Sequence, residues 1–272
     1  MVLIAGTTLS AFAQGEGKTS FNDAKTIDGS MIRPNPYDKF IALDDALGEN
    51  TVDWRGILST LQVDVNPEDL SDKEVGIPAM LGFRICDGVM AIKARDAEML
   101  RACADDIEAL GKIMGVTDGD LRRAKLVRSY ADRGLWTRVF LELGFLQQDI
   151  ENVLKRDFDK SSEKGTVPVG KILYAAGWMQ GARYTSTIIS QNYNPTTAGL
   201  LREPRLVAEL NKQLGEVSNR KDADIVKILS TALTELEQLV DVPMGGKISE
   251  KNVKRIAEVT STIVSKCRET AK

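Results

Sequence analysis

The sequence predicts a mainly α-helical protein built from two packed helical subdomains or bundles. Three observations support this prediction. After residue 36, apolar residues recur every three or four positions, as they do along one face of a helix. Glycine, proline and helix-capping residues stand where these runs begin or end. The 272 residues are 43% hydrophobic and 28% charged, which is typical of globular proteins and sufficient for a buried core.

The first residues have the character of a secretory signal peptide. The run from Val2 to Phe12 is apolar or small, and the triplet Ala11-Phe12-Ala13 fits the A-x-A cleavage pattern. We expect cleavage after Ala13, so that residues 1–13 are removed and the mature chain is periplasmic or extracellular. Two features depart from the pattern, because the apolar run is short and no Lys or Arg precedes it. A short strand or helix packed on the core is the alternative for these residues.

The hexapeptide GEGKTS at residues 15–20 ends like a phosphate-binding loop. The pattern G-x-x-x-x-G-K-[ST] requires a glycine five residues before Gly17, where this chain has Phe12. The run Ser10–Lys18 also resembles the phosphate loop of bacterial tyrosine kinases, although it is one residue longer and has Gln14 in place of proline. That resemblance implies a nucleotide site on alternating strands and helices, whereas the rest of this sequence predicts helices. We therefore expect no cofactor.

Residues 14–36 are expected to form a polar, flexible linker, because two prolines near its end suit an extended tether. An N-terminal helical domain is predicted at 37–158. Its helices are expected at 38–47, 52–61, 89–114, 117–132 and 136–156, each with one apolar face. The segment Phe83–Cys86 fits either a buried helix or a short strand. It is therefore the place where the N-terminal half could hold a minor β element.

Residues 159–167 are the predicted linker to a C-terminal helical bundle at 168–272. The first helix of this bundle is rich in glycine and alanine, and small side chains allow a second helix to approach closely. Amphipathic patterns predict further helices over 203–214, 222–240 and 249–264. No run approaches ~18 apolar residues, so we expect no transmembrane segment in the mature chain.

The sequence contains no histidine, and this excludes Ser-His-Asp and Cys-His catalysis as well as zinc sites that need imidazole. The three cysteines, Cys86, Cys103 and Cys267, form no C-x-x-C pair, so we expect no metal site of this kind. We expect buried thiols. A disulfide between Cys86 and Cys103 is the alternative, since sequence alone does not show whether their helices lie side by side.

Catalysis in this chain would depend on carboxylates. The neighbouring acids Asp105, Asp106 and Glu108 are expected to face solvent, and the acidic stretches near Asp64 and Asp157 lack the glycine and glutamate of a calcium loop. A carboxylate-dependent hydrolase, of the peptidase or glycosidase type, remains an alternative function. It requires a pocket in which two carboxylates from different segments meet with raised pKa values.

Basic residues form two clusters, which are the candidate binding residues. Arg122, Arg123, Lys125 and Arg128 lie on one predicted helix, and Lys247, Lys251, Lys254 and Arg255 lie at the start of the last one. Such clusters can bind phosphate, sulfate or nucleic acid, and they also fit an ordinary solvated surface. The sequence therefore favours an exported, non-catalytic binding or interaction module with an unknown protein or polyanionic partner. Nucleic acid is the less favoured polyanion, because export separates the protein from genomic DNA.

Overall fold

The computed structural model describes residues 26–27, 30–31, 36–48, 51–71, 74–161, 169–215, 224–243 and 246–272. The chain divides into a unit of Met1–Arg33 and a unit of Pro34–Lys272. In the first unit, strand β1 (Thr26–Ile27) pairs antiparallel with strand β2 (Ser30–Met31). In the second unit, the regular structure of the described residues is helical, which confirms the mainly α-helical class.

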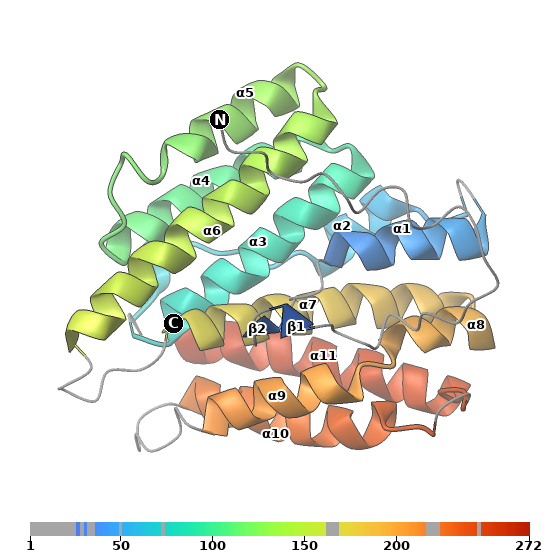
Figure 1. Cartoon of the computed structure of the whole chain (residues 1–272). Helices are drawn as coiled ribbons and strands as arrows, with labels where there is room; N and C mark the ends of the chain where they lie inside the picture. The colour runs from blue at the N-terminus through green and yellow to red at the C-terminus, as the bar shows by residue number, and fades with distance from the viewer. Residues whose placement is uncertain are drawn as a thin grey trace. The chain divides into compact units, whose positions relative to one another are not determined.

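The helices of the second unit follow one another with short connections. The first half consists of α1 (Pro36–Leu47), α2 (Trp54–Leu61), the 3-10 helix η1 (Pro67–Asp69), α3 (Gly76–Ala94), α4 (Ala97–Ile113), α5 (Arg122–Asp132) and α6 (Trp136–Ser161). The second half consists of α7 (Val169–Gln191), α8 (Pro195–Ala198), the 3-10 helix η3 (Gly199–Leu201), α9 (Pro204–Gly215), α10 (Asp224–Val240) and α11 (Glu250–Ala271). Figure 1 shows this order by colour.

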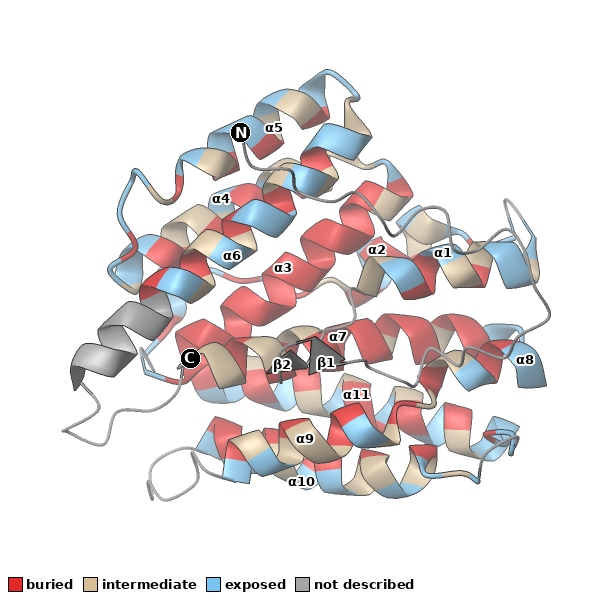
Figure 2. Ribbon diagram, viewed as in Figure 1, coloured by how far each residue is buried: buried red, intermediate tan, exposed pale blue. Residues whose placement is uncertain are grey.

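Helices α3 and α7 pack against each other in the middle of this unit (Figure 1). Every residue of α3 except Lys93 is buried, and the inner face of α7 is equally buried, as the red ribbon in Figure 2 shows. The two backbones touch at Gly82. A Cβ atom at this position would overlap the Leu173 carbonyl oxygen and would lie 2.9 Å from the Gly177 nitrogen. The close helix contact that the sequence predicts for the small residues of α7 is therefore present, where Gly82 of α3 meets Gly177 of α7.

The other helices cover this central pair on two sides. Helices α4 and α6 pack on α3, and α5 packs on both α4 and α6. On the opposite side, α11 packs on α7, α10 packs on α11, and α9 packs on α10. Helices α1 and α2 contact both α3 and α7. None of the helices that the structure describes is long and apolar enough to cross a membrane.

In the first half, the structure confirms the helical alternative for Phe83–Cys86 over the strand, and it corrects one predicted helix. The segment Phe83–Cys86 lies inside α3, and no strand occurs among the described residues between 36 and 161. The predicted helix over 89–114 is two helices, because Arg95 adopts a left-handed conformation with φ of 50°. The side chain of Asp96 then caps α4 by accepting a hydrogen bond from the Met99 amide at 3.0 Å.

Some predictions fall outside the described part of the chain. They are the signal peptide at 1–13, the motif at 15–20 and most of the linker at 14–36. Most of the linker predicted at 159–167 also lies outside it, so the division into two helical subdomains stays a prediction. What the structure does describe is a shared interface, because α3 and α7 come from the two predicted halves.

Candidate functional site

The basic cluster on α5 is half neutralised by its neighbours. Arg123 forms ion pairs with Glu142 at 2.8 Å and Asp149 at 2.7 Å, both on α6. Arg128 forms ion pairs with Asp105 and Glu108 of α4, both at 2.7 Å. These two arginines therefore join α5 to the helices beside it. The other two members of the cluster, Arg122 and Lys125, are exposed on the outer side of α5.

The second basic cluster, at the start of α11, shows the same division. Lys254 pairs with Glu250 at 2.6 Å, and Arg255 pairs with Glu235 of α10 at 2.6 Å, while Lys247 and Lys251 are exposed. The structure does not bring the two clusters together. Helices α5 and α11 lie on opposite sides of the α3–α7 pair (Figure 1).

Three apolar side chains are exposed on the antiparallel pair formed by α5 and α6. The exposed fractions are 37% for Leu126, 51% for Leu141 and 36% for Phe145. Two cation–π contacts show how the helices align. The Arg123 guanidinium of α5 lies 4.8 Å from the centre of the Phe145 ring on α6. The Arg138 guanidinium of α6 lies 5.6 Å from the centre of the Tyr130 ring on α5. Along α5, Leu126 lies between Arg123 and Tyr130. Along α6, Leu141 lies between Arg138 and Phe145. The geometry of an α-helix therefore places the three apolar side chains on one surface.

Exposed cations surround these three residues. We define the α5–α6 outer face by its seven members, all exposed: Leu126, Leu141, Phe145, Arg122, Lys125, Arg133 and Arg138. Leu141 and Phe145 are not among the binding residues expected from the sequence. The signal was present, because they are four residues apart and lie on the side of the helix opposite the buried residues Val139, Leu143 and Leu146. Apolar residues that recur at helical spacing away from the core face indicate a second apolar surface.

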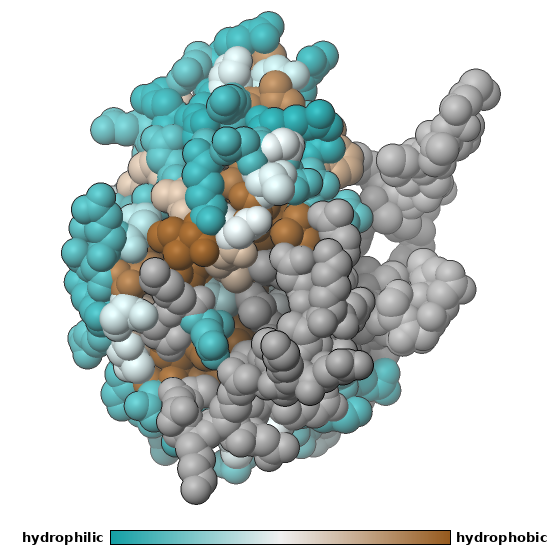
Figure 3. Space-filling model, turned by 90° about the vertical axis from the view of Figure 1, so that its left-hand side faces the viewer, coloured by the Kyte–Doolittle hydropathy of each residue, from teal (hydrophilic) through white to brown (hydrophobic). Residues whose placement is uncertain are grey.

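Apolar residues also reach the surface elsewhere. Ile41 on α1 and Ile113 on α4 are exposed to 41% and 42%. Figure 3, which shows the molecule from one side, has hydrophobic residues at the surface among hydrophilic ones. What distinguishes the α5–α6 outer face is therefore the grouping of its apolar residues with cations, and not exposure alone.

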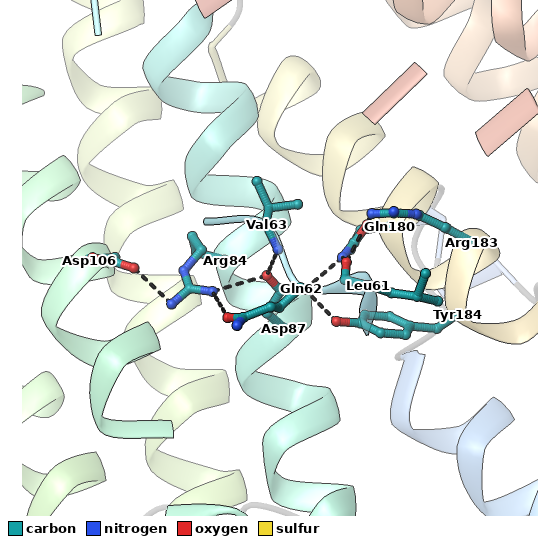
Figure 4. A network of polar contacts seen from close by, with 9 residues as sticks. All are labelled: Leu61, Gln62, Val63, Arg84, Asp87, Asp106, Gln180, Arg183 and Tyr184. Atoms are coloured by element: carbon teal, nitrogen blue, oxygen red, sulfur yellow. Dashed lines mark hydrogen bonds and ion pairs between the residues drawn. The ribbon is translucent and has the colours of Figure 1, made fainter. Parts of the chain in front are cut away.

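A network of polar contacts lies between α3 and α7 (Figure 4). Its centre is Asp87, which has no exposed surface. The carboxylate accepts hydrogen bonds from the Val63 amide at 2.8 Å, Gln180 Nε2 at 2.7 Å, Tyr184 Oη at 2.8 Å and Arg84 Nη1 at 3.1 Å. Burial raises the pKa of Asp87, and the charge of Arg84 and the other three donors oppose that rise. Both carboxylate oxygens have partners, so this carboxylate serves the structure.

Arg84 joins a second carboxylate to this network. Its Nη2 lies 2.7 Å from Oδ2 of Asp106 on α4, and burial raises the pKa of Asp106 as well. The expectation that Asp106 and Glu108 face solvent is wrong, because only 22% and 17% of their side chains are exposed. Two carboxylates with raised pKa values thus lie on different helices, as a carboxylate hydrolase requires. The guanidinium stands between them and Asp87 is fully buried, so they cannot share a proton or reach a substrate in this arrangement.

A pocket of about 390 Å³ lies between α2 and the end of α7. Its walls are made by Thr51, Val52, Asp53, Gly56, Ile57, Thr60, Leu61, Thr187, Ile188, Gln191 and Asn192. The carbonyl oxygen of Leu61, a wall residue, accepts hydrogen bonds from Gln180 and Arg183, both at 2.9 Å, which attaches α2 to α7. The single carboxylate, Asp53, caps α2 by accepting a hydrogen bond from the Gly56 amide. The pocket therefore offers hydroxyl, amide and aliphatic groups to a small polar molecule.

The cysteines are free and buried, as expected, and the alternative of a Cys86–Cys103 disulfide is wrong. Burial raises the pKa of all three thiols, that of Cys267 to about 12. Among the residues described, no group of three or more Cys, Asp or Glu side chains is placed to hold a metal ion. Comparisons with known protein families, with curated proteins and with solved structures find no match to this chain.

Proposed function

We propose that the chain is an exported, non-catalytic binding module that contacts its partner through the α5–α6 outer face. The observation that carries this proposal is the grouping of Leu126, Leu141 and Phe145 on one exposed surface. Side chains of this kind stabilise a protein only weakly when they remain in water, and contact with a partner removes their apolar surface from it.

The charges on this surface indicate the sign of the charge that its partner carries. Within the described residues, the acids Glu142 and Asp149 are already paired with Arg123, whereas Arg122, Lys125, Arg133 and Arg138 stand exposed around the apolar side chains. The outward-facing charge of the surface is therefore positive. A partner with negative charge and some apolar surface complements it best.

Site-specific photo-crosslinking in cells tests this proposal. The photoreactive residue p-benzoylphenylalanine is placed at position 141, and at position 41 as a control with a similarly exposed apolar side chain. We expect an adduct, with protein or with lipid, from position 141 and none from position 41. Equal adducts from both positions, or none from either, would contradict a partner site on the α5–α6 outer face.

The proposed export of the chain leads to a separate prediction about its amino terminus. When the full chain is expressed in a secreting bacterium, we expect the mature protein to begin at Gln14, because Ala11-Phe12-Ala13 places small residues where signal peptidase requires them. Mass spectrometry of the periplasmic fraction measures this. An Ala13→Arg variant should accumulate uncleaved. Recovery of the wild-type chain in the cytoplasm with Val2 or Met1 at its terminus would show that the export proposal is wrong.

Binding of a soluble polyanion, with nucleic acid as one example, is the second candidate function. The exposed residues Lys247 and Lys251 at the start of α11 favour it. It predicts that Lys247→Glu combined with Lys251→Glu lowers the salt concentration at which the protein elutes from a heparin column. Elution of wild type and variant together at low salt would exclude this candidate.

A further inference from the structure

We infer that the partner of the α5–α6 outer face is an anionic lipid surface. This inference rests on the proposed function, because it names the partner of the same face. The surface combines three exposed apolar side chains with four exposed cations on two helices that lie side by side. A helical surface with apolar residues at its centre and Lys or Arg around them is the arrangement that binds at the boundary between lipid headgroups and acyl chains.

The apolar residues match the depth of that boundary. Leu141 and Phe145 are one helical turn apart on α6, and the helix alignment places Leu126 of α5 beside them. The Arg123 guanidinium lies over the Phe145 ring, while 36% of Phe145 remains exposed. With α5 and α6 lying flat on a membrane, these three side chains enter the acyl region and the backbones of both helices stay at the level of the headgroups.

The cations match the charge of the lipid. Arg122, Lys125, Arg133 and Arg138 have long side chains, which reach lipid phosphates while their apolar stems lie along the membrane surface. The nearby carboxylates reduce this positive charge only in part. Arg123 offsets one of the two charges of Glu142 and Asp149, and Arg101 offsets that of Asp132, so the four exposed cations outnumber the one negative charge that remains.

Two other partners fit the surface less well. A soluble polyanion would use the cations and leave Leu126, Leu141 and Phe145 in water. A protein partner usually inserts an aromatic or arginine anchor into a well-packed pocket. The pocket described above lies between α2 and the end of α7, and none of its walls belongs to α5 or α6. A lipid surface needs no such pocket.

Co-sedimentation of the mature chain with vesicles tests the inference. The vesicles consist of phosphatidylcholine alone, or of phosphatidylcholine with about one third phosphatidylglycerol. We expect binding to the second kind, and binding that weakens as salt is added. Arg122→Glu combined with Lys125→Glu should lower the partition coefficient at least about tenfold, because each cation near an anionic membrane contributes about fivefold. The matched control, Lys212→Glu with Lys266→Glu on α9 and α11, should change it less than about twofold.

A second pair of variants tests the apolar residues. Leu141→Ser combined with Phe145→Ser should lower the partition coefficient about tenfold, because less apolar surface enters the membrane. Ile41→Ser combined with Ile113→Ser removes similarly exposed side chains elsewhere and should leave binding unchanged. Circular dichroism confirms that each variant is folded before its binding is compared.

The outcomes separate this inference from the proposed function. Absence of binding to the anionic vesicles, or binding that both variant pairs leave unchanged, overturns the inference. If the vesicles stay unbound while position 141 crosslinks to a protein, the binding module stands and its partner is a protein. If position 141 gives no adduct either, the proposed function fails as well. Loss of heparin retention in the Arg122 and Lys125 variant, without vesicle binding, identifies a soluble polyanion instead.

Discussion

The variant Gly82→Ala is expected to lower the free energy of unfolding by about 3 kcal/mol, an effect at the upper end of those seen for overpacked cores. The added methyl group would overlap the Leu173 carbonyl oxygen and approach the Gly177 nitrogen to 2.9 Å. Both are backbone atoms, so a change of side-chain rotamer cannot relieve the contact. Helices α3 and α7 must separate, and the buried side chains along both of them lose contacts. Chemical denaturation followed by circular dichroism measures the loss.

Gly144→Ala is the matched control for this variant. Gly144 is an exposed residue of α6, and a Cβ atom at its position would meet nothing within 4 Å. Alanine should stabilise this helix by about 0.5–1 kcal/mol, because it restricts the unfolded chain. Equal stability of the Gly82 variant and wild type would contradict the close backbone contact between α3 and α7.

The variant Asp87→Ala is expected to cost about 3–5 kcal/mol of stability, as the removal of one partner from a buried ion pair usually does. Arg84 would remain buried with Asp106 as its remaining charged partner. The Val63 amide, Gln180 and Tyr184 would each lose an acceptor. The control is Asp105→Asn, which breaks the ion pair of a largely exposed carboxylate with Arg128 and should cost at most about 1 kcal/mol.

The raised pKa of Asp87 adds a pH dependence to this comparison. The folded chain holds a proton on this carboxyl at pH values where the unfolded chain, with a pKa near 3.8, has lost it. The stability that the raised pKa of Asp87 contributes to the folded state is fully present below pH 3.8. It is lost as the pH rises through the pKa of Asp87 in the folded state. The stability difference between wild type and Asp87→Ala should therefore decrease as the pH rises from 4. A stability difference that increases over this range would show that the donors around Asp87 lower its pKa by more than burial raises it.

Local signals in the sequence predict much of the helical structure. Apolar spacing predicts α6, α10 and α11. Gly115 follows the end of α4 with a φ of 83°, which suits glycine. The same spacing continues through Arg95 and Asp96, so the break between α3 and α4 was missed. Periodicity also fails within α3, because a helix that is buried on all sides has no polar face to reveal its period.

The candidate sites depend on tertiary contacts, which local signals do not contain. The basic residues of α5 were found from the sequence, but their acidic partners Glu142 and Asp105 belong to neighbouring helices. The Asp87 network joins residues near positions 63, 84 and 180, and a distance of 93 residues separates Asp87 from Gln180. No pattern within one helix could bring these groups together.

We expect the α3–α7 contact to make one cooperative unit of the helices before and after it, which holds the α5–α6 outer face in a fixed shape. The three buried cysteines report on this, since Cys86 lies on α3, Cys103 on α4 and Cys267 on α11. Thiol labelling across a denaturant series, read for each cysteine by mass spectrometry, is the most direct test. A single cooperative unit predicts that all three become reactive at the same denaturant concentration. Labelling of Cys267 at a clearly different concentration from Cys86 and Cys103 would show that the two halves unfold independently.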